Sequence, residues 1–323
     1  MKTRRVFLLG AGASKSWGLP LTNELFPLAL TGVKKRASRD LIRKFIQYQY
    51  PHFRKRWKNY PPFEEFLSLV DVYLEFADVI KRGHSFSIED VRQIRKELLL
   101  AISVVLHGAR SGAAHSNVRR FAQVLRPGDA VITFNWDLLI EEALYDMGTD
   151  WEYGLQEKAI SILKPHGSLD WYHRAELSIK PELFFPLNRR FRKIVVFRSF
   201  RAPRVEDPAV PVILPPVVNK KIEYKELQSI WRDAWLALRH AAEIYILGYS
   251  LPAEDLNARF TIRSAIRGNE KLERHKLRIT VVNPDRNVYL RFARLVEGNV
   301  KYYESGLQGI SLNEMLADDG ETE

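Results

Sequence analysis

The sequence predicts an α/β protein with a Rossmann-like, doubly wound, mainly parallel sheet and a large helical insertion after the first strand. Apolar strands alternate with helical patterns around residues 130–148, 241–266 and 277–296, and such alternation favours a parallel sheet. A further apolar run, Arg5 to Leu9, precedes a long segment in which apolar side chains recur at helical spacing. We therefore expect a series of helices between the first strand and the next strand along the chain.

We expect one domain over residues 1–323, with its core at about 1–20 and 126–310 and the helical insert at about 21–125. The helical pattern is clearest at residues 63–80 and 88–109. Within it, "EEFLSLVD" (64–71) is interpreted as helical core. Residues 172–222 are rich in Pro and Arg, and only a strand entering a loop, at 211–220, is expected there.

The chain of 323 residues is 46% apolar and contains no cysteine. Disulfides, cysteine-based zinc sites and a thiol nucleophile are therefore excluded. No segment approaches the roughly 18–20 consecutive apolar residues of a membrane span. A cytoplasmic protein without membrane attachment is expected.

The net charge is +11, and the excess gathers at residues 34–44, 52–58 and 188–204. Basic stretches of this kind favour phosphate-bearing partners, so a nucleic acid could contact them. A solvated basic face is the alternative.

Five predicted strand ends carry unusual residues: Gly10–Ser14, Thr133–Asp137, His166–Ser168, Gly248–Ser250 and Asn283–Asp285. The carboxyl ends of parallel strands in an open α/β sheet line one crevice, where ligands bind. We therefore expect these segments to meet in one site.

The glycine turn allows a tight bend and a close approach of the backbone to a phosphate. Lys15 stands where the dehydrogenase fingerprint has its third glycine, so a hydride-transfer cofactor is not indicated. A purely structural turn is the alternative.

Asn135 and Asp137 are two residues apart at a strand end, so they face the same way in extended geometry. An amide that can hold water and ribose hydroxyls, beside a carboxylate that can accept from a carboxamide, suits a nicotinamide riboside. The alternative is that Asn135 caps a helix starting near Trp136.

His166 ends a strand in a Pro-His-Gly turn. Histidine as a residue type exchanges protons near neutral pH, so a histidine here would suit a base toward a ribose hydroxyl. The alternative is a histidine that merely packs under the turn.

These stretches resemble the sirtuin superfamily, in particular its bacterial sirtuin-like branch of NAD-consuming defence enzymes. The resemblance rests on an ordered set from residue 8 to residue 285: "LLGAGASKSWGLP", "VITFNWD", "KPHGS", "VILPPVVNK", "ILGYSL" and "VVNPD".

The resemblance implies that Asn135 and His166 are catalytic, the first toward water and the second toward ribose hydroxyls. Asp137 would hold the nicotinamide carboxamide. The remaining implied NAD⁺ contacts are Gly10, Ala11, Gly12, Ser14, Gly248, Ser250 and Asn283. Lys220 resembles a recurrent lysine of the family without an assigned role.

Two departures from deacylating sirtuins bear on the activity. "GLPLTNEL" replaces their Pro-Asp-Phe-Arg stretch, and the four-cysteine zinc module is impossible here. The resemblance then implies an NAD⁺ glycohydrolase that uses NAD⁺ as substrate, without zinc, to yield nicotinamide and ADP-ribose. The alternatives are an NAD-dependent deacylase or ADP-ribosyltransferase, and a catalytically silent NAD- or ADP-ribose-binding subunit of a nucleic-acid-associated complex. Hydrolysis and cyclisation of NAD⁺ stay open.

The resemblance also implies a role in antiviral defence, with activity gated by assembly. A homo-oligomer, or a partner such as a DNA-pumping ATPase or an Argonaute-type protein, would supply the gate.

Overall fold

The computed structural model describes residues 4–53, 60–77, 85–108, 113–177, 184–187, 191–197, 210–215, 222–270, 276–296 and 300–317. Within these ranges the main sheet has seven strands in the order β11-β10-β9-β1-β2-β4-β3, and every neighbouring pair is parallel. The strands are β1 (Arg4–Leu9), β2 (Ala130–Thr133), β3 (Trp151–Tyr153), β4 (Ile160–Leu163), β9 (Ala241–Leu247), β10 (Arg278–Val282) and β11 (Val300–Tyr303). The predicted α/β fold class is thereby confirmed.

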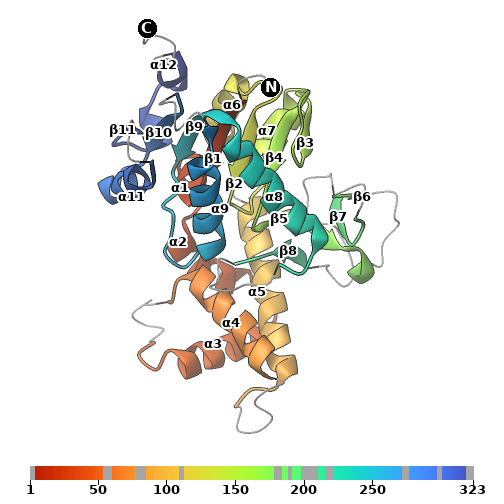
Figure 1. Ribbon diagram of the computed structural model, residues 1–323. Helices are drawn as coiled ribbons and strands as arrows, with labels where there is room; N and C mark the ends of the chain where they lie inside the picture. The colour runs from red at the N-terminus through yellow and green to blue at the C-terminus, as the bar shows by residue number, and fades with distance from the viewer. Residues whose placement is uncertain are drawn as a thin grey trace.

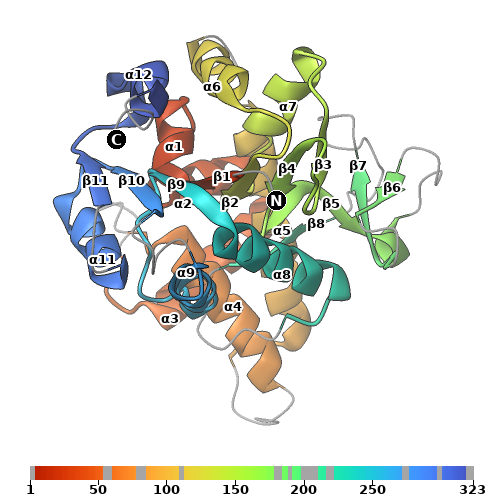
Figure 2. The same cartoon turned by 45° about the horizontal axis from the view of Figure 1, so that its top comes forward.

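The strand order reverses at β1, which pairs with β2 on one side and β9 on the other. Its segment from Val6 to Leu9 is fully buried, as expected for a central strand covered on both faces. Helix α7 (Leu139–Asp146) follows β2, whereas α9 (Leu256–Arg267) and α11 (Arg286–Val296) follow β9 and β10. Figure 2 shows α7 on one side of the sheet and α9 on the other, which is the doubly wound arrangement.

The helices between β1 and β2 are α1 (Ala11–Ser16), α2 (Thr22–Gly32), α3 (Arg36–Gln49), α4 (Phe63–Ala77), α5 (Ile88–Gly108) and α6 (Ala113–Val124). Helices α2 to α5 pack on one another and extend beyond one end of the sheet (Figure 1). Helix α6 instead packs beside α7 (Figure 2). The region predicted as a helical insert therefore contributes to two parts of the molecule.

Aromatic side chains form the core of the α2–α5 group. The Phe26 ring meets the Phe66 ring edge-on at 4.9 Å, and Phe45 meets Phe86 in the same way at 5.0 Å. Edge-to-face pairs at such distances stabilise beyond simple burial of area. The group is a packed body and can hold its side chains in fixed positions toward the sheet.

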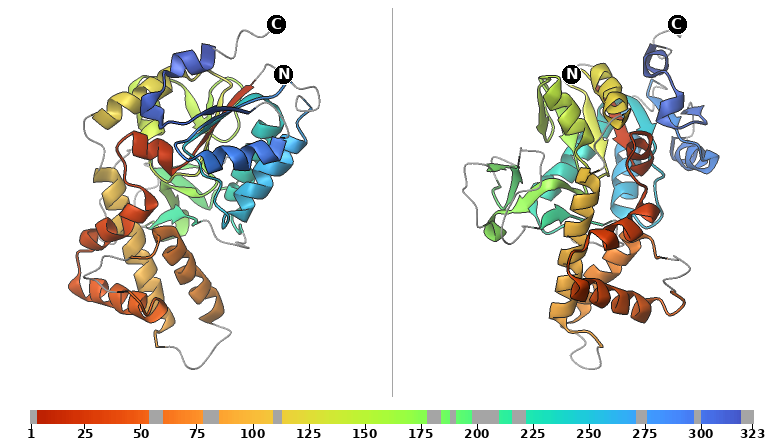
Figure 3. Two further views of the ribbon diagram at one scale, coloured as in Figure 1. Left: turned by 90° about the vertical axis from the view of Figure 1, so that its left-hand side faces the viewer. Right: turned by 180° about the vertical axis from the view of Figure 1, so that it is seen from behind.

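A second, antiparallel sheet has the order β6-β7-β5-β8, with β5 (Gly167–His173), β6 (Phe184–Pro186), β7 (Ile194–Phe197) and β8 (Pro211–Ile213). The strand expected at the start of 211–220 is confirmed as β8. The other pairings were not predicted, because they join segments whose sequence shows no regular pattern. Figure 3 shows this sheet at the flank of the main one.

The remaining helices are α8 (Lys225–Arg239), which packs against α9 and the main sheet, and the short α12 (Leu312–Ala317) near α6. None of the described helices is long and apolar enough to cross a membrane. Lys220 lies outside the described residues, as do parts of the basic segments 52–58 and 188–204. The prediction of a nucleic-acid contact there stays a prediction.

Candidate functional site

A cavity of about 670 Å³ opens at the carboxyl ends of β1, β2, β9 and β10, where the strand order reverses. Eight of the ten residues predicted to form a site line it: Gly10, Ala11, Gly12, Asn135, His166, Gly248, Ser250 and Asn283. The other two, Ser14 and Asp137, line a side cavity of about 40 Å³. The structure thus brings the five predicted segments to one place.

The glycine turn packs against the loop after β9. Gly10 N donates to Leu247 O at 3.2 Å, and Gly12 N donates to Gly248 O at 3.0 Å. A Cβ on Gly10 would lie 2.6 Å from Tyr249 Cα, and one on Gly12 would lie 2.9 Å from Gly248 Cα. The two glycines therefore serve close loop packing, and the Gly12 N–H is already used by a backbone carbonyl.

Asn135 is held by two hydrogen bonds from its side-chain nitrogen. Nδ2 donates to Gly10 O at 2.8 Å and to Ser14 Oγ at 2.8 Å. Helix α7 begins only at Leu139, so the alternative that Asn135 caps a helix starting near Trp136 is wrong. Asp137 Oδ1 instead accepts from Leu139 N at 3.2 Å. The Asn135 amide is thus free of a capping role, and its carbonyl oxygen is the atom suited to hold a water or a hydroxyl.

Ser14 connects the glycine turn to Asp137. Its hydroxyl donates to Asp137 Oδ2 at 2.7 Å while accepting from Asn135. Ser14 is buried and does not line the main cavity. In this arrangement it positions the Asn135–Asp137 loop, a role that its place in the glycine turn did not predict.

A buried lysine, Lys164, bonds the backbone of the Asn135–Asp137 loop. Lys164 Nζ donates to the backbone oxygens of Trp136, at 3.4 Å, and Asp137, and lies 2.9 Å from Glu141 Oε1. The Lys164 and Glu141 side chains are 0% and 1% exposed. The cost of removing both charges from water offsets much of the attraction in a buried ion pair, so the pair adds little net stability. Its bonds to the backbone nevertheless hold the loop in one conformation. Sequence analysis missed this pair, although "KPHGS" contains the lysine.

His166 lies in the turn between β4 and β5. Its backbone oxygen accepts from Leu214 N at 2.8 Å, and its ring meets the Phe134 ring at 5.1 Å. The next residue, Gly167, has φ +84°, and a Cβ there would lie 2.0 Å from Val212 O. Glycine at position 167 is therefore required for the chain to pass close to β8 while the preceding His166 ring lines the cavity.

Asp255 pairs with His166, with 3.0 Å between Oδ2 and the imidazole Nε2. It also caps α9 by accepting from Ala258 N at 3.1 Å. Burial raises the pKa of Asp255, but the hydrogen bond and charge of His166 outweigh it, so the net pKa lies below its usual value. A carboxylate at Nε2 fixes the imidazole tautomer and leaves Nδ1 as the basic nitrogen. Sequence analysis missed Asp255, because it lies outside the strand-end motifs.

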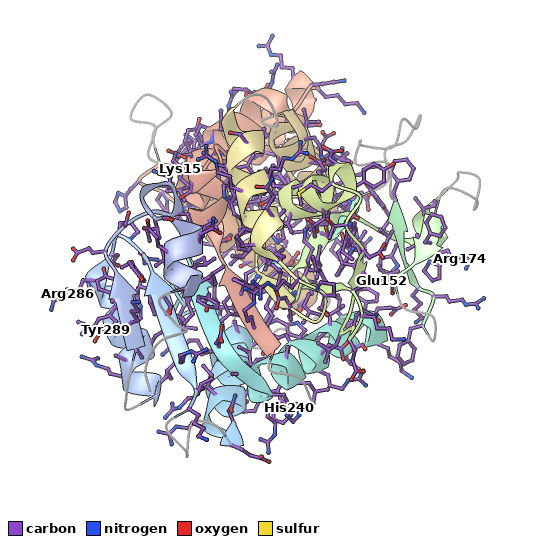
Figure 4. All side chains as sticks on the ribbon, turned by 90° about the horizontal axis from the view of Figure 1, so that it is seen from above. Lys15, Glu152, Arg174, His240, Arg286 and Tyr289 are labelled. Atoms are coloured by element: carbon purple, nitrogen blue, oxygen red, sulfur yellow. The ribbon has the colours of Figure 1, made fainter. Side chains whose placement is uncertain are left out.

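Two charged side chains complete the cavity wall. Glu64, from the first turn of α4, lies near His166 and Asp255, and burial raises its pKa to about 7. Lys15 Nζ lies 2.7 Å from Glu24 Oε2 at the rim. In Figure 4, Lys15 lies on the side of the molecule that carries Arg286 and Tyr289 of α11, away from Glu152 and Arg174.

Among the described residues, no three His, Asp or Glu side chains form a group that could hold a metal ion. The chemistry of the site, as far as it is described, rests on an amide, a His–Asp pair and a carboxyl of raised pKa. Such groups can hold water, move protons and stabilise a developing cation.

No protein-family model and no curated protein matches the chain. Solved structures of Sir2 proteins are similar to it. Sir2Tm bound to a propionylated peptide aligns at 16% identity and TM-score 0.44, over 98% of this chain and 93% of the other. Sir2 in complex with an inhibitor, 2′-O-acetyl-ADP-ribose and a deacetylated p53 peptide aligns at 15% identity and TM-score 0.43, over 98% and 94%.

Similarity at this level does not define an activity, which must follow from the residues of the site. The fold and the site define an α/β protein with a large cavity at the switch point of a doubly wound sheet, the place where such sheets bind ligands.

Proposed function

We propose that this protein is an NAD⁺ glycohydrolase, which cleaves the bond between nicotinamide and ribose to give nicotinamide and ADP-ribose. The observation that carries the proposal is the junction of the two cavities at Asn135. The larger cavity has the volume of a typical ligand site, and the smaller one ends at Asp137. A dinucleotide bound in the larger cavity would direct its nicotinamide toward the smaller cavity and Asp137.

The placement of polar groups supports this orientation. The pyrophosphate would lie over the glycine turn, which leaves room for it, beside Lys15 and the Ser250 hydroxyl. Asn283 follows β10, one strand further from Asn135, and would bind the adenosine ribose. Asp137 would accept from the carboxamide N–H₂ of nicotinamide. The sirtuin-like motifs imply the same assignments for the glycine turn, Ser250, Asn283 and Asp137, but not for Lys15.

Cleavage develops positive charge on the ribose, as in other glycoside hydrolyses, and nicotinamide departs as a neutral molecule. The protein must therefore orient the ribose, stabilise the developing charge and supply water. Asn135 would hold the water through its carbonyl oxygen, and the His166–Asp255 pair would act on the ribose hydroxyls. Water takes the place of an acyl group, in line with the absence of cysteines for a zinc module.

We further propose that the enzyme acts in the cytoplasm as an NAD⁺-depleting defence effector. Continuous NAD⁺ loss would be lethal, so a homo-oligomer or a partner protein must hold the activity off until it is triggered. The sirtuin-like defence resemblance supports this part of the proposal.

The test is chromatography of NAD⁺ products from protein made with its neighbouring genes present. Wild type is compared with Asn135→Ala and His166→Ala, and His240→Ala serves as a matched control because His240 is exposed at the end of α8. We expect nicotinamide and ADP-ribose from wild type and the control, and at least about 100-fold less from the two site variants. Cyclic ADP-ribose would show cyclisation. Bound but uncleaved NAD⁺ in every sample would contradict the proposal and favour a silent binding subunit.

A further inference from the structure

Glu64 enters the site from a part of the chain that carries none of the strand-end motifs. It lies in the first turn of α4, whose neighbouring Phe63, Phe66 and Leu67 are fully buried in the α2–α5 core. The Phe63 ring also meets the Trp136 ring edge-on at 6.3 Å. This contact fastens the start of α4 to the Asn135–Asp137 loop, so the position of Glu64 relative to Asn135 is fixed by packing.

The two cavities of the site share four lining residues: Ala11, Glu64, Phe134 and Asn135. Glu64 is the titratable member of this set. If the nicotinamide ring lies at the mouth of the side cavity, with its carboxamide toward Asp137, and the rest of NAD⁺ fills the main cavity, the scissile C1′–N bond lies near this junction. A carboxyl group is thus placed beside the reacting carbon, next to the amide that would hold the water.

The surroundings of Glu64 suit a group that exchanges a proton. Burial raises its pKa to about 7, the charge of His166 opposes this rise, and the nearby carboxylates Asp255 and Glu254 add to it. Lys15, the cation at the cavity rim, is paired with Glu24. Within the described part of the chain, no hydrogen bond or ion pair engages the Glu64 carboxyl group. It is therefore available to a ligand or a water.

We propose that Glu64 is the catalytic base of the hydrolysis, the residue that takes the proton from the attacking water. The inference rests on the proposed function and deepens it. The C1′–N bond breaks with its electron pair going to nicotinamide, and the water oxygen bonds to C1′. One water proton passes to the Glu64 carboxylate and later to solvent, so that NAD⁺ and water yield nicotinamide, ADP-ribose and H⁺.

The bound substrate would prepare this base. The nicotinamide ring of NAD⁺ is a cation, and a positive charge beside a carboxyl group favours its ionised form. Binding of NAD⁺ would therefore release a proton from Glu64 near neutral pH and generate the carboxylate in the complex. The helical insert, through α4, would supply the group that selects water as the acceptor.

The experiment compares wild type with Glu64→Gln, Glu64→Asp and the matched control Glu75→Gln, which makes the same change at an exposed position of α4. Nicotinamide release is measured under single-turnover conditions from about pH 5 to pH 9. Proton release on NAD⁺ binding is measured by calorimetry in buffers of different ionisation enthalpy. Azide, an anionic nucleophile that needs no deprotonation, is added in a parallel series.

We expect Glu64→Gln to lower the rate at least about 100-fold, the size of a general-base contribution. It should also abolish the proton release and regain nicotinamide release with azide, with ADP-ribosyl azide as product. Glu64→Asp should retain part of the rate, and Glu75→Gln should behave as wild type. A wild-type rate in Glu64→Gln would overturn this role alone. Normal NAD⁺ affinity without azide rescue would also overturn it, in favour of a positioning role. No release by wild type would overturn the proposed function itself.

Discussion

From the raised pKa of Glu64 we predict how the free energy of unfolding changes with pH, and this prediction does not depend on any catalytic activity. Glu64→Gln replaces the carboxyl group by a neutral amide of the same shape. Burial raises the pKa of Glu64 from 4.5 to about 7 in the folded chain. The fold therefore disfavours the ionised carboxylate, and the wild type carries a penalty that the variant lacks.

The sign and size of the penalty follow from the thermodynamic linkage between proton binding and folding. Below about pH 4.5 the group is protonated in both states, so no penalty exists; it grows between about pH 4.5 and pH 7 and is complete above pH 7. The shift of about 2.5 units corresponds to at most about 3.4 kcal/mol, at 1.36 kcal/mol per unit. Because the cavity is open to solvent and Glu64 is only partly buried, screening reduces this to about 1–2 kcal/mol.

The assay is urea unfolding of wild type, Glu64→Gln and Glu75→Gln at about pH 5 and about pH 8. The free energy of unfolding of Glu64→Gln minus that of wild type should be larger at about pH 8 than at about pH 5, by about 1–2 kcal/mol. Glu75→Gln, at an exposed position, should follow the wild type at both. An equal difference at both pH values, or a difference that shrinks as the pH rises, would refute the assignment of the raised pKa.

Three further substitutions test the support of the site. Asp255→Asn should lower nicotinamide release about 10- to 100-fold and change its pH profile while NAD⁺ still binds, because His166 loses the carboxylate at Nε2; an unchanged profile would contradict this. Lys164→Met should leave Glu141 as an unpaired buried charge and cost about 3–5 kcal/mol, measured by urea unfolding; a loss under 1 kcal/mol would show that the carboxylate finds other partners. Gly167→Ala should lower the melting temperature by several degrees, because φ is +84° and a backbone oxygen of β8 occupies the Cβ position; a wild-type melting curve would show that β8 can move aside.

The fold class and the strand ends could be predicted because their signals are local. A buried parallel strand is a short apolar run, and Gly10 or Gly248 can be recognised in a turn without knowledge of its partner. The physical reason for these two glycines was accessible only in three dimensions. A Cβ on Gly248, with φ +61°, would lie 2.3 Å from Ala13 N, so each turn excludes side chains on the other.

The second sheet could not be predicted, because antiparallel pairing joins distant segments and β5 is paired irregularly with β8. The role of Asn135 was also ambiguous in the sequence. Asn is a favoured helix cap, and only the start of α7 at Leu139 showed that Asp137, two residues further on, bonds the helix end. Local propensity thus allowed both interpretations, and the structure excludes the helix cap at Asn135.

Two charged residues of the site, Asp255 and Glu64, could not be predicted from the sequence for a related reason. Asp255 caps α9, and its second bond, to His166, leaves no trace in the sequence. Glu64 belongs to a stretch interpreted as helical core, and its neighbours on α4 are core residues. An amphipathic pattern records which face of a helix is buried, but it does not distinguish a face turned to solvent from one turned to a ligand cavity. The insert was therefore recognised as a helical body, whereas the contribution to the chemistry proposed for Glu64 depends on tertiary packing such as that of Phe63 on Trp136.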